Sequence, residues 1–120
     1  MAEDKPPYSP SEKRANLRSP LIVMQAKMGD ARQYFFGYAK NISRSGVFIQ
    51  TVNPKALGEE FNIEFTLPKT SSPVKCRCKV VWSRKYSASN FSIEPGMGLE
   101  FIDIDPLDAD TIDSWVRSQP

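Results

Sequence analysis

Apolar and polar residues alternate with a period of two along much of this 120-residue chain. Every second residue is Phe, Ile or Leu within residues 60–67, and Val, Cys or Trp within residues 74–83. Successive side chains of a strand point to opposite faces, so this alternation predicts half-buried antiparallel strands. Apolar or aromatic segments bounded by Gly, Pro, Asn or Asp predict four more strands, at residues 21–28, 34–41, 46–52 and 96–104.

One helix is predicted at residues 106–118, after the last strand. Asp105 suits the N-cap position and the proline that follows it suits the first helical position. Ile112, Trp115 and Val116 form a single apolar stripe, which we expect to dock on the sheet. Six short strands followed by one helix predict a mainly β fold, a small antiparallel β-barrel with one C-terminal helix.

Domain boundaries follow from proline content. Residues 1–12 contain three prolines and are predicted to form a flexible arm, and residues 13–120 are predicted to form one domain. Residues 11–18 are expected to form a helical turn or a loop, because Ser19-Pro20 ends any helix before the first strand. No apolar run is long enough to span a bilayer and no signal peptide is recognised, so we expect a cytoplasmic protein without membrane insertion.

Charge is unevenly distributed along the chain. Residues 13–85 hold 14 Lys and Arg against 4 Asp and Glu, whereas residues 86–120 hold 1 against 7. A basic body of this kind attracts phosphates, although a solvated lysine-rich surface has the same composition.

Catalytic and metal sites are hard to build from this sequence, which contains no histidine. A serine nucleophile would lack its usual base, and the two cysteines, Cys76 and Cys78, are too few for a zinc site and are read as buried, reduced thiols. The aspartates at positions 103, 105, 108 and 110 are explained by the dipole of the predicted helix, because the calcium-loop pattern is absent. We therefore predict a protein that is not an enzyme and that has no metal or cofactor.

Two short motifs have binding chemistry. Arg14 and Arg18 are four residues apart just before the first strand, and two guanidiniums can converge on one anionic ligand. Asn41, Ser43 and Gly46 follow at the turn between the second and third strands. Local hydrogen bonds and a positive φ at the glycine would explain such a turn without a ligand. Alternatively, the amide accepts from a guanine, the hydroxyl donates to a phosphate, and the glycine permits close approach.

Taken together, Arg14-x-x-x-Arg18 and Asn41-x-Ser43-x-x-Gly46 resemble the signature of the PilZ domain family, and the resemblance covers roughly residues 12–118. It implies a six-stranded barrel with a C-terminal helix, and cyclic di-GMP as ligand. It also implies an output through a protein partner, in motility or exopolysaccharide control.

The resemblance implies a role for each motif residue. Arg14 and Arg18 would grip phosphates and guanine, while Asn41, Ser43 and Gly46 would form the barrel side of the site. Asn41 stands where many members have Asp, so we expect weaker guanine recognition. Lys13 precedes the first arginine, and a basic residue there favours an intercalated ligand dimer.

Trp82 has two interpretations. Similar members have an aromatic residue near the ligand at this position. Alternation instead places Trp82 on the core face with Cys76, Cys78 and Val80, and we favour the core.

The leading hypothesis is a receptor in which cyclic di-GMP orders residues 8–20 against the barrel and creates a surface for a protein partner. One alternative is a degenerate adaptor of the same fold that binds proteins and no nucleotide. Another is a small basic barrel that binds single-stranded nucleic acid through Tyr34, Phe36 and Tyr38, which the acidic final third disfavours.

Overall fold

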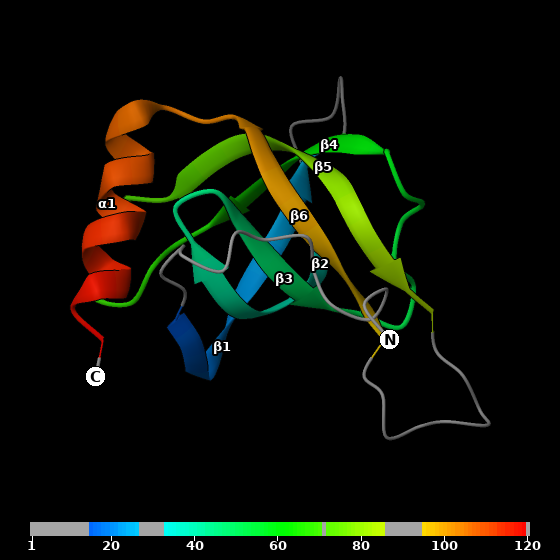
Figure 1. The fold of residues 1–120 in the computed structure, drawn as a ribbon, viewed down its shortest axis with the longest axis horizontal. Coiled ribbons are helices and arrows are strands. Elements are labelled where there is room, and N and C mark those ends of the chain that lie inside the picture. The colour runs from blue at the N-terminus through cyan, green and yellow to red at the C-terminus, as the bar shows by residue number, and fades with distance from the viewer. Residues whose placement is uncertain (1–14, 27–32, 71, 86–94, 120) are drawn as a thin grey trace.

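The computed structural model describes residues 15–26, 33–70, 72–85 and 95–119. Within these ranges the chain forms six β-strands and one α-helix (Figure 1). Their bounds in chain order are β1 Ala15–Ala26, β2 Gln33–Ser43, β3 Gly46–Gln50, β4 Glu60–Phe65, β5 Val74–Arg84, β6 Gly96–Asp103 and α1 Pro106–Arg117. The predicted flexible arm, residues 1–12, lies outside the described residues.

The strands close into one antiparallel barrel in the spatial order β1-β2-β3-β6-β5-β4. The chain forms two three-stranded meanders, β1 to β3 and β4 to β6, and the pairing of β3 with β6 and of β1 with β4 joins them. Closure satisfies both edges of the sheet. The predicted six-stranded antiparallel barrel with one C-terminal helix is confirmed.

The barrel interior is filled by the alternating apolar residues. β4 and β5 show the period-two pattern of buried and more exposed side chains on which their prediction depended. The side chains with at most 1% exposure in this core include Val23, Ala39, Ile42, Val47, Ile49, Ile63, Cys78, Val80, Met97 and Leu99. Each strand therefore has one face toward this core and one face away from it, and the outward faces together form the outer wall of the barrel.

Helix α1 covers the barrel at the end next to the turn between β2 and β3 (Figure 1). Ile112 and Val116 are completely buried and belong to the core cluster, and Trp115 packs against it. The Asp105 carboxylate accepts a hydrogen bond of 2.8 Å from the backbone N–H of Leu107, which confirms the predicted N-cap. The helix ends one residue earlier than predicted.

Toward the other end of β3, the connection from β3 to β4 folds against the barrel. The backbone N–H of Lys55 contacts the sulfur of Met97 at 3.4 Å, and the Ser83 hydroxyl donates to the Lys55 carbonyl at 3.1 Å. The Lys55 ammonium lies 5.9 Å from the ring centroids of both Phe36 and Phe61.

Strand β1 begins at Ala15, so the prediction of a helical turn or loop through residue 18 is wrong for the described part of that segment. The prediction relied on Pro20 as a boundary, but Pro20 lies inside the strand. The pairing of β1 with β2 shifts register between Asn16 and Leu21, and this irregularity includes the proline. A proline is tolerated in a strand where the ladder is interrupted, because it has no N–H to donate.

Phe36 and Tyr38 of β2 do not share the continuous face that nucleic-acid binding would need, and the side chain of Tyr34 is not among the described side chains. Phe36 packs against the core, with its ring centroid 4.9 Å from that of Phe61. Tyr38 is 46% exposed and pairs across the sheet with Ile22. The register of β1 against β2 shifts beside Phe36, and the side chains of Phe36 and Tyr38 therefore differ in direction although they are two residues apart.

Candidate functional site

The second motif spans the end of β2, a turn and the start of β3. Asn41 and Ser43 belong to β2, the turn consists of Arg44 and Ser45, and Gly46 pairs with Ser43 at the start of β3. Among the described residues, positive φ angles occur at positions 58 and 69, so neither turn residue nor Gly46 has one. The hairpin therefore does not use the mirror-image turns that require positive φ.

Ser43 is the one polar residue that is buried among those the structure describes, and its exposure is 0%. Its hydroxyl oxygen accepts from the backbone N–H of Ser45 at 3.3 Å. The same oxygen lies 3.4 Å from the Ser45 hydroxyl and 3.5 Å from the Gly46 carbonyl oxygen. The Ser43 side chain therefore stabilises the turn, as the interpretation through local hydrogen bonds predicts. Its contact with a phosphate stays a prediction.

Gly46 is needed for a reason other than backbone conformation. A Cβ atom at this position would lie 2.3 Å from the carbonyl oxygen of Leu99 on β6. The backbone N–H of Phe101, also on β6, donates to the Ser45 carbonyl at 2.9 Å and holds the two strands at this distance. The expectation of a positive φ is wrong, because the close approach of β6 alone excludes a side chain.

A row of residues crosses four strands on the outer wall of the barrel. Asn41 of β2 pairs with Phe48 of β3, Phe48 pairs with Gly98 of β6, and Gly98 pairs with Trp82 of β5. The neighbours of Phe48 and of Gly98 along their strands are core residues, so these positions face outward. The row places the motif asparagine on the same wall as two aromatic side chains.

Trp82 reaches this wall because of a bulge. The register of β5 against β6 shifts between Val80 and Trp82, so Val80 pairs with the core residue Leu99 while Trp82 pairs with Gly98. A bulge inserts one extra residue and reverses the alternation that follows. Trp82 is buried, with 9% exposure, which agrees with its prediction as a packing residue, but it pairs with Gly98 and does not belong to the cluster that contains Cys76, Cys78 and Val80.

The two aromatic rings on the outer wall contact each other. The ring centroids of Phe48 and Trp82 are 5.3 Å apart, with a tilt of 51° between the planes. The Arg84 guanidinium lies over the Trp82 ring, 4.8 Å from its centroid. A Cβ atom at Gly96 would lie 2.8 Å from an atom of the Phe48 ring, so this glycine gives the ring its space. Both rings are largely buried, with 7% exposure for Phe48 and 9% for Trp82, so only a small part of this aromatic pair is accessible beside the guanidinium.

Strand β1 brings the first motif toward this wall through its backbone. Asn16 is the register partner of Asn41, and Arg18 follows two residues later in β1, within the irregular stretch before Leu21. The side chain of Arg18 is not among the described side chains, and Arg14 and Lys13 lie outside the described residues. Their contact with a ligand stays a prediction.

The family model that describes the PilZ domain matches residues 12–118. The chain belongs to the PilZ domain family. Members of this family are commonly receptors for cyclic di-GMP and are typically non-catalytic.

Solved structures with a similar fold include the following three. The PilZ domain of YcgR from Escherichia coli with cyclic di-GMP is 15% identical, with a TM-score of 0.65, and covers 92% of this chain and 91% of that one. The Bacillus subtilis inhibitor of motility MotI/DgrA is 16% identical, with a TM-score of 0.69, and covers 92% of this chain and 50% of that one. YcgR from E. coli in complex with cyclic di-GMP is 15% identical, with a TM-score of 0.67, and covers 90% of this chain and 44% of that one.

This PilZ domain thus spans about half the length of MotI/DgrA and of the longer YcgR chain. No curated protein matches its sequence. In the part of the chain that the structure describes, no helix has the length and apolar character to cross a membrane.

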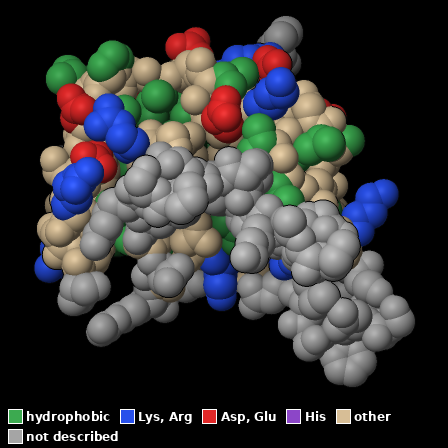
Figure 2. Space-filling model, viewed as in Figure 1, with side chains coloured by type: hydrophobic (Ala, Val, Ile, Leu, Met, Phe, Trp, Pro, Cys, Tyr) green, Lys and Arg blue, Asp and Glu red, His purple; other side chains and the backbone are tan. Residues whose placement is uncertain are grey.

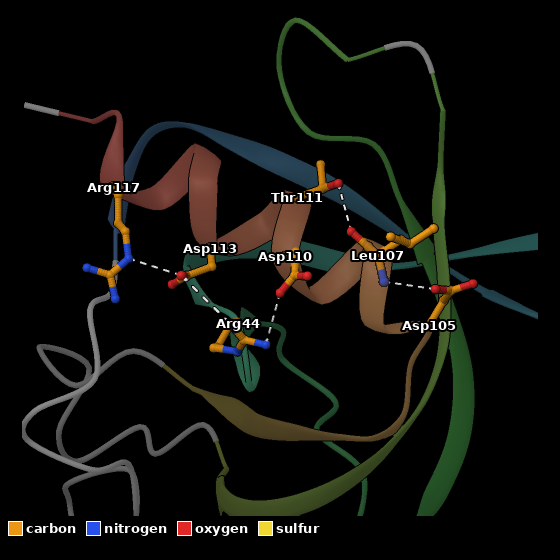
Figure 3. A network of polar contacts seen from close by, with 7 residues as sticks. All are labelled: Arg44, Asp105, Leu107, Asp110, Thr111, Asp113 and Arg117. Atoms are coloured by element: carbon orange, nitrogen blue, oxygen red, sulfur yellow. Dashed lines mark hydrogen bonds and ion pairs between the residues drawn. The ribbon is translucent and has the colours of Figure 1, made fainter.

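Arg44 points from the turn of this PilZ domain toward α1 (Figure 3). One of its guanidinium nitrogens lies 3.2 Å from a carboxylate oxygen of Asp110, and the other lies 3.8 Å from one of Asp113. The Arg117 guanidinium binds the same Asp113 carboxylate at 3.0 Å. Arg44 and Asp110 are 66 positions apart in the sequence, so local patterns do not predict this network.

Several other basic side chains have acidic partners on the outer wall. Arg77 of β5 lies 3.3 Å from Glu60 of β4, and Lys75 lies 3.8 Å from Glu64. Figure 2 shows Lys and Arg side chains next to Asp and Glu side chains on one face of the molecule. The strongly basic central segment is therefore partly neutralised where β4 and β5 pair.

Cys76 and Cys78 are free and buried, which confirms their prediction as reduced thiols. Burial, together with the Asp108 and Asp103 carboxylates, raises the pKa of Cys76 from 9.0 to about 12. Burial also raises the pKa of Cys78, whose thiol donates to the Phe61 carbonyl at 3.4 Å. Both groups are neutral at physiological pH and are poor nucleophiles.

An open pocket of about 530 Å³ lies over β4 and β5 near the start of α1. Its lining combines Lys75 and Arg77 with Glu64, Asp103 and Asp105. The two basic residues already bind glutamates of β4, and Asp105 already caps the helix. Within the described ranges, no three His, Cys, Asp or Glu side chains gather as a metal-binding group.

Proposed function

We propose that this PilZ domain is a non-enzymatic receptor that binds cyclic di-GMP on the outer wall of its barrel. The row formed by Asn41, Phe48 and Trp82 is the observation that carries the proposal. It combines an amide that can recognise a guanine edge with rings on which a base can stack. β1, which contains Arg18, pairs with β2 beside Asn41.

Each group has a distinct chemical task in this proposal. The Asn41 carbonyl accepts from the N–H groups of a guanine, and the accessible edge of the largely buried Phe48–Trp82 pair gives the base an apolar contact. Arg14 and Arg18 supply charge-assisted hydrogen bonds to the phosphates. Lys13, which precedes Arg14 in the sequence, adds a positive charge that favours a ligand dimer.

The proposed output is a change of surface. Cyclic di-GMP would bridge residues 8–20 and the barrel, so part of the contact energy is used in ordering that segment. The new surface would bind a protein partner in motility or exopolysaccharide control. The similarity to an inhibitor of motility and to a complex with cyclic di-GMP supports this direction.

Isothermal titration calorimetry with cyclic di-GMP tests the receptor function. We expect micromolar binding by the wild type and a loss of at least about tenfold in Arg14→Ala and in Arg18→Ala, since each removes charge-assisted hydrogen bonds. Arg77→Ala is the matched control, because it removes the same charge from the β4–β5 wall. No heat and no change in melting temperature with the wild type would refute the proposal.

A degenerate adaptor that binds only proteins is the second candidate. The structure of the turn favours it in one respect, because Ser43 and Gly46 have roles in the fold that need no ligand. These residues would persist in a protein that had lost nucleotide binding. The same titration separates the two functions, since the adaptor gives no heat.

A further inference from the structure

We infer that Arg44 is shared between α1 and the bound ligand: it leaves the carboxylates of Asp110 and Asp113 for a phosphate when cyclic di-GMP binds. The ligand site is then coupled to α1 through one side chain. This inference rests on the proposed receptor function and extends it to the regulation of the same site.

The position of α1 does not depend on Arg44. Ile112 and Val116 are completely buried in the core cluster and Ala109 is 7% exposed, so apolar packing holds the helix against the barrel. The Asp105 cap stabilises its first turn independently. Removal of the Arg44 contacts therefore leaves the helix in place.

The two carboxylates also lose little when Arg44 leaves. Asp113 keeps its ion pair with Arg117, at 3.0 Å. The Asp110 side chain is 66% exposed and the Arg44 side chain is 48% exposed, so water already solvates much of this pair. An exposed ion pair with single contacts contributes little to stability.

The ligand is the stronger competitor for this guanidinium. Cyclic di-GMP has two phosphodiesters, and an arginine can bind a phosphate through two parallel hydrogen bonds. Arg44 is adjacent in sequence to Ser43 and three residues from Asn41, within the motif that would contact the ligand. Its transfer would leave Asp113 paired with Arg117 and Asp110 without the Arg44 contact, and the surface of α1 would become more negative.

A double-mutant cycle measured by calorimetry with cyclic di-GMP tests the inference. We expect Arg44→Gln to weaken binding by about tenfold, because it removes a phosphate contact. We expect Asp110→Asn to tighten binding by about threefold, because it removes the competitor of the phosphate. In the combined variant the gain from Asp110→Asn should disappear.

Arg77→Gln and Glu60→Gln are the matched controls, since they remove the same charges from another exposed ion pair. Thermal unfolding of each variant checks that it folds, and Arg44→Lys, which keeps the charge but not the two-bond geometry, should bind with intermediate affinity. Equal affinities for Arg44→Gln and Arg77→Gln would overturn the inference. So would an unchanged or weaker affinity for Asp110→Asn, or a gain that persists without Arg44.

The outcomes distinguish this inference from the receptor function itself. Binding that requires Arg14 and Arg18 but is indifferent to Arg44 would keep the receptor and refute the coupling to α1. A wild type that does not bind cyclic di-GMP would refute both.

Discussion

Replacement of Gly46 by alanine should destabilise the fold even when no ligand is present. The new Cβ would lie 2.3 Å from the Leu99 carbonyl oxygen, so the atoms must separate by about 1 Å to reach ordinary contact. β3 and β6 are paired here, and the hydrogen bond from Phe101 to the Ser45 carbonyl, 2.9 Å long, resists their separation. The substitution therefore strains the β3–β6 seam of the barrel.

The size of the effect follows from three terms. Overpacking costs about 1–3 kcal/mol and a weakened hydrogen bond about 0.5–1.5 kcal/mol. The lower entropy of the unfolded alanine chain offsets about 0.4–1 kcal/mol. We expect Gly46→Ala to reduce the free energy of unfolding by about 0.5–4 kcal/mol, which lowers the melting temperature by several degrees.

Urea and thermal unfolding followed by circular dichroism measure this loss on the ligand-free protein. Thr66→Ala is the control at an exposed position just after β4 and should change stability by less than about 0.5 kcal/mol. A Gly46→Ala protein that is as stable as the wild type but fails to bind cyclic di-GMP would refute the structural explanation. Gly46 would then serve the ligand alone.

Two further predictions concern the aromatic pair and the thiols. Phe48→Ala and Trp82→Ala should each weaken cyclic di-GMP binding by about tenfold or more. Because the ring centroids are 5.3 Å apart, a double-mutant cycle should also show a coupling in stability of about 0.5–1.5 kcal/mol between the two substitutions. Unchanged affinity in both variants would exclude the outer wall as the site. Cys76 should react slowly with thiol reagents at pH 8, because burial raises its pKa from 9.0 to about 12. The neutral thiol therefore stabilises the fold fully below about pH 9, and this contribution is lost as the pH rises toward 12. A Cys76→Ala variant should lose less stability over that alkaline range, and rapid labelling of native Cys76 would contradict its burial.

The sequence predicted the parts of the fold that depend on period and on capping. Alternation located β4 and β5, and the Asp105 cap with the stripe at Ile112 and Val116 located α1. These signals are local, because each residue is read against neighbours two to four positions away. Closure of the barrel was predicted only as a consequence of six short strands and one helix.

The outer wall could not be predicted in the same way, because its geometry depends on bulges. The single extra residue between Val80 and Trp82 moves the tryptophan from the core face to the face of Asn41, and alternation in the sequence does not predict this bulge. The irregularity around Pro20 extends β1 back to Ala15 in a similar way. Both shifts are set by the register against the next strand along the chain, which the alternation within one strand does not contain.

The Asn-x-Ser-x-x-Gly motif combines requirements of the fold with requirements of the ligand. The barrel itself needs Gly46 for the approach of β6, and the turn uses the Ser43 hydroxyl for its own hydrogen bonds. A protein that had lost its ligand would still keep both residues, so their presence argues for the barrel more than for cyclic di-GMP. Arg44, by contrast, has a side chain that is 48% exposed and pairs with the exposed Asp110 and with Asp113, which keeps Arg117 as a second partner, so the fold can lose these contacts. Substitutions at Arg44 therefore discriminate between receptor and adaptor more sharply than substitutions at the motif serine or glycine.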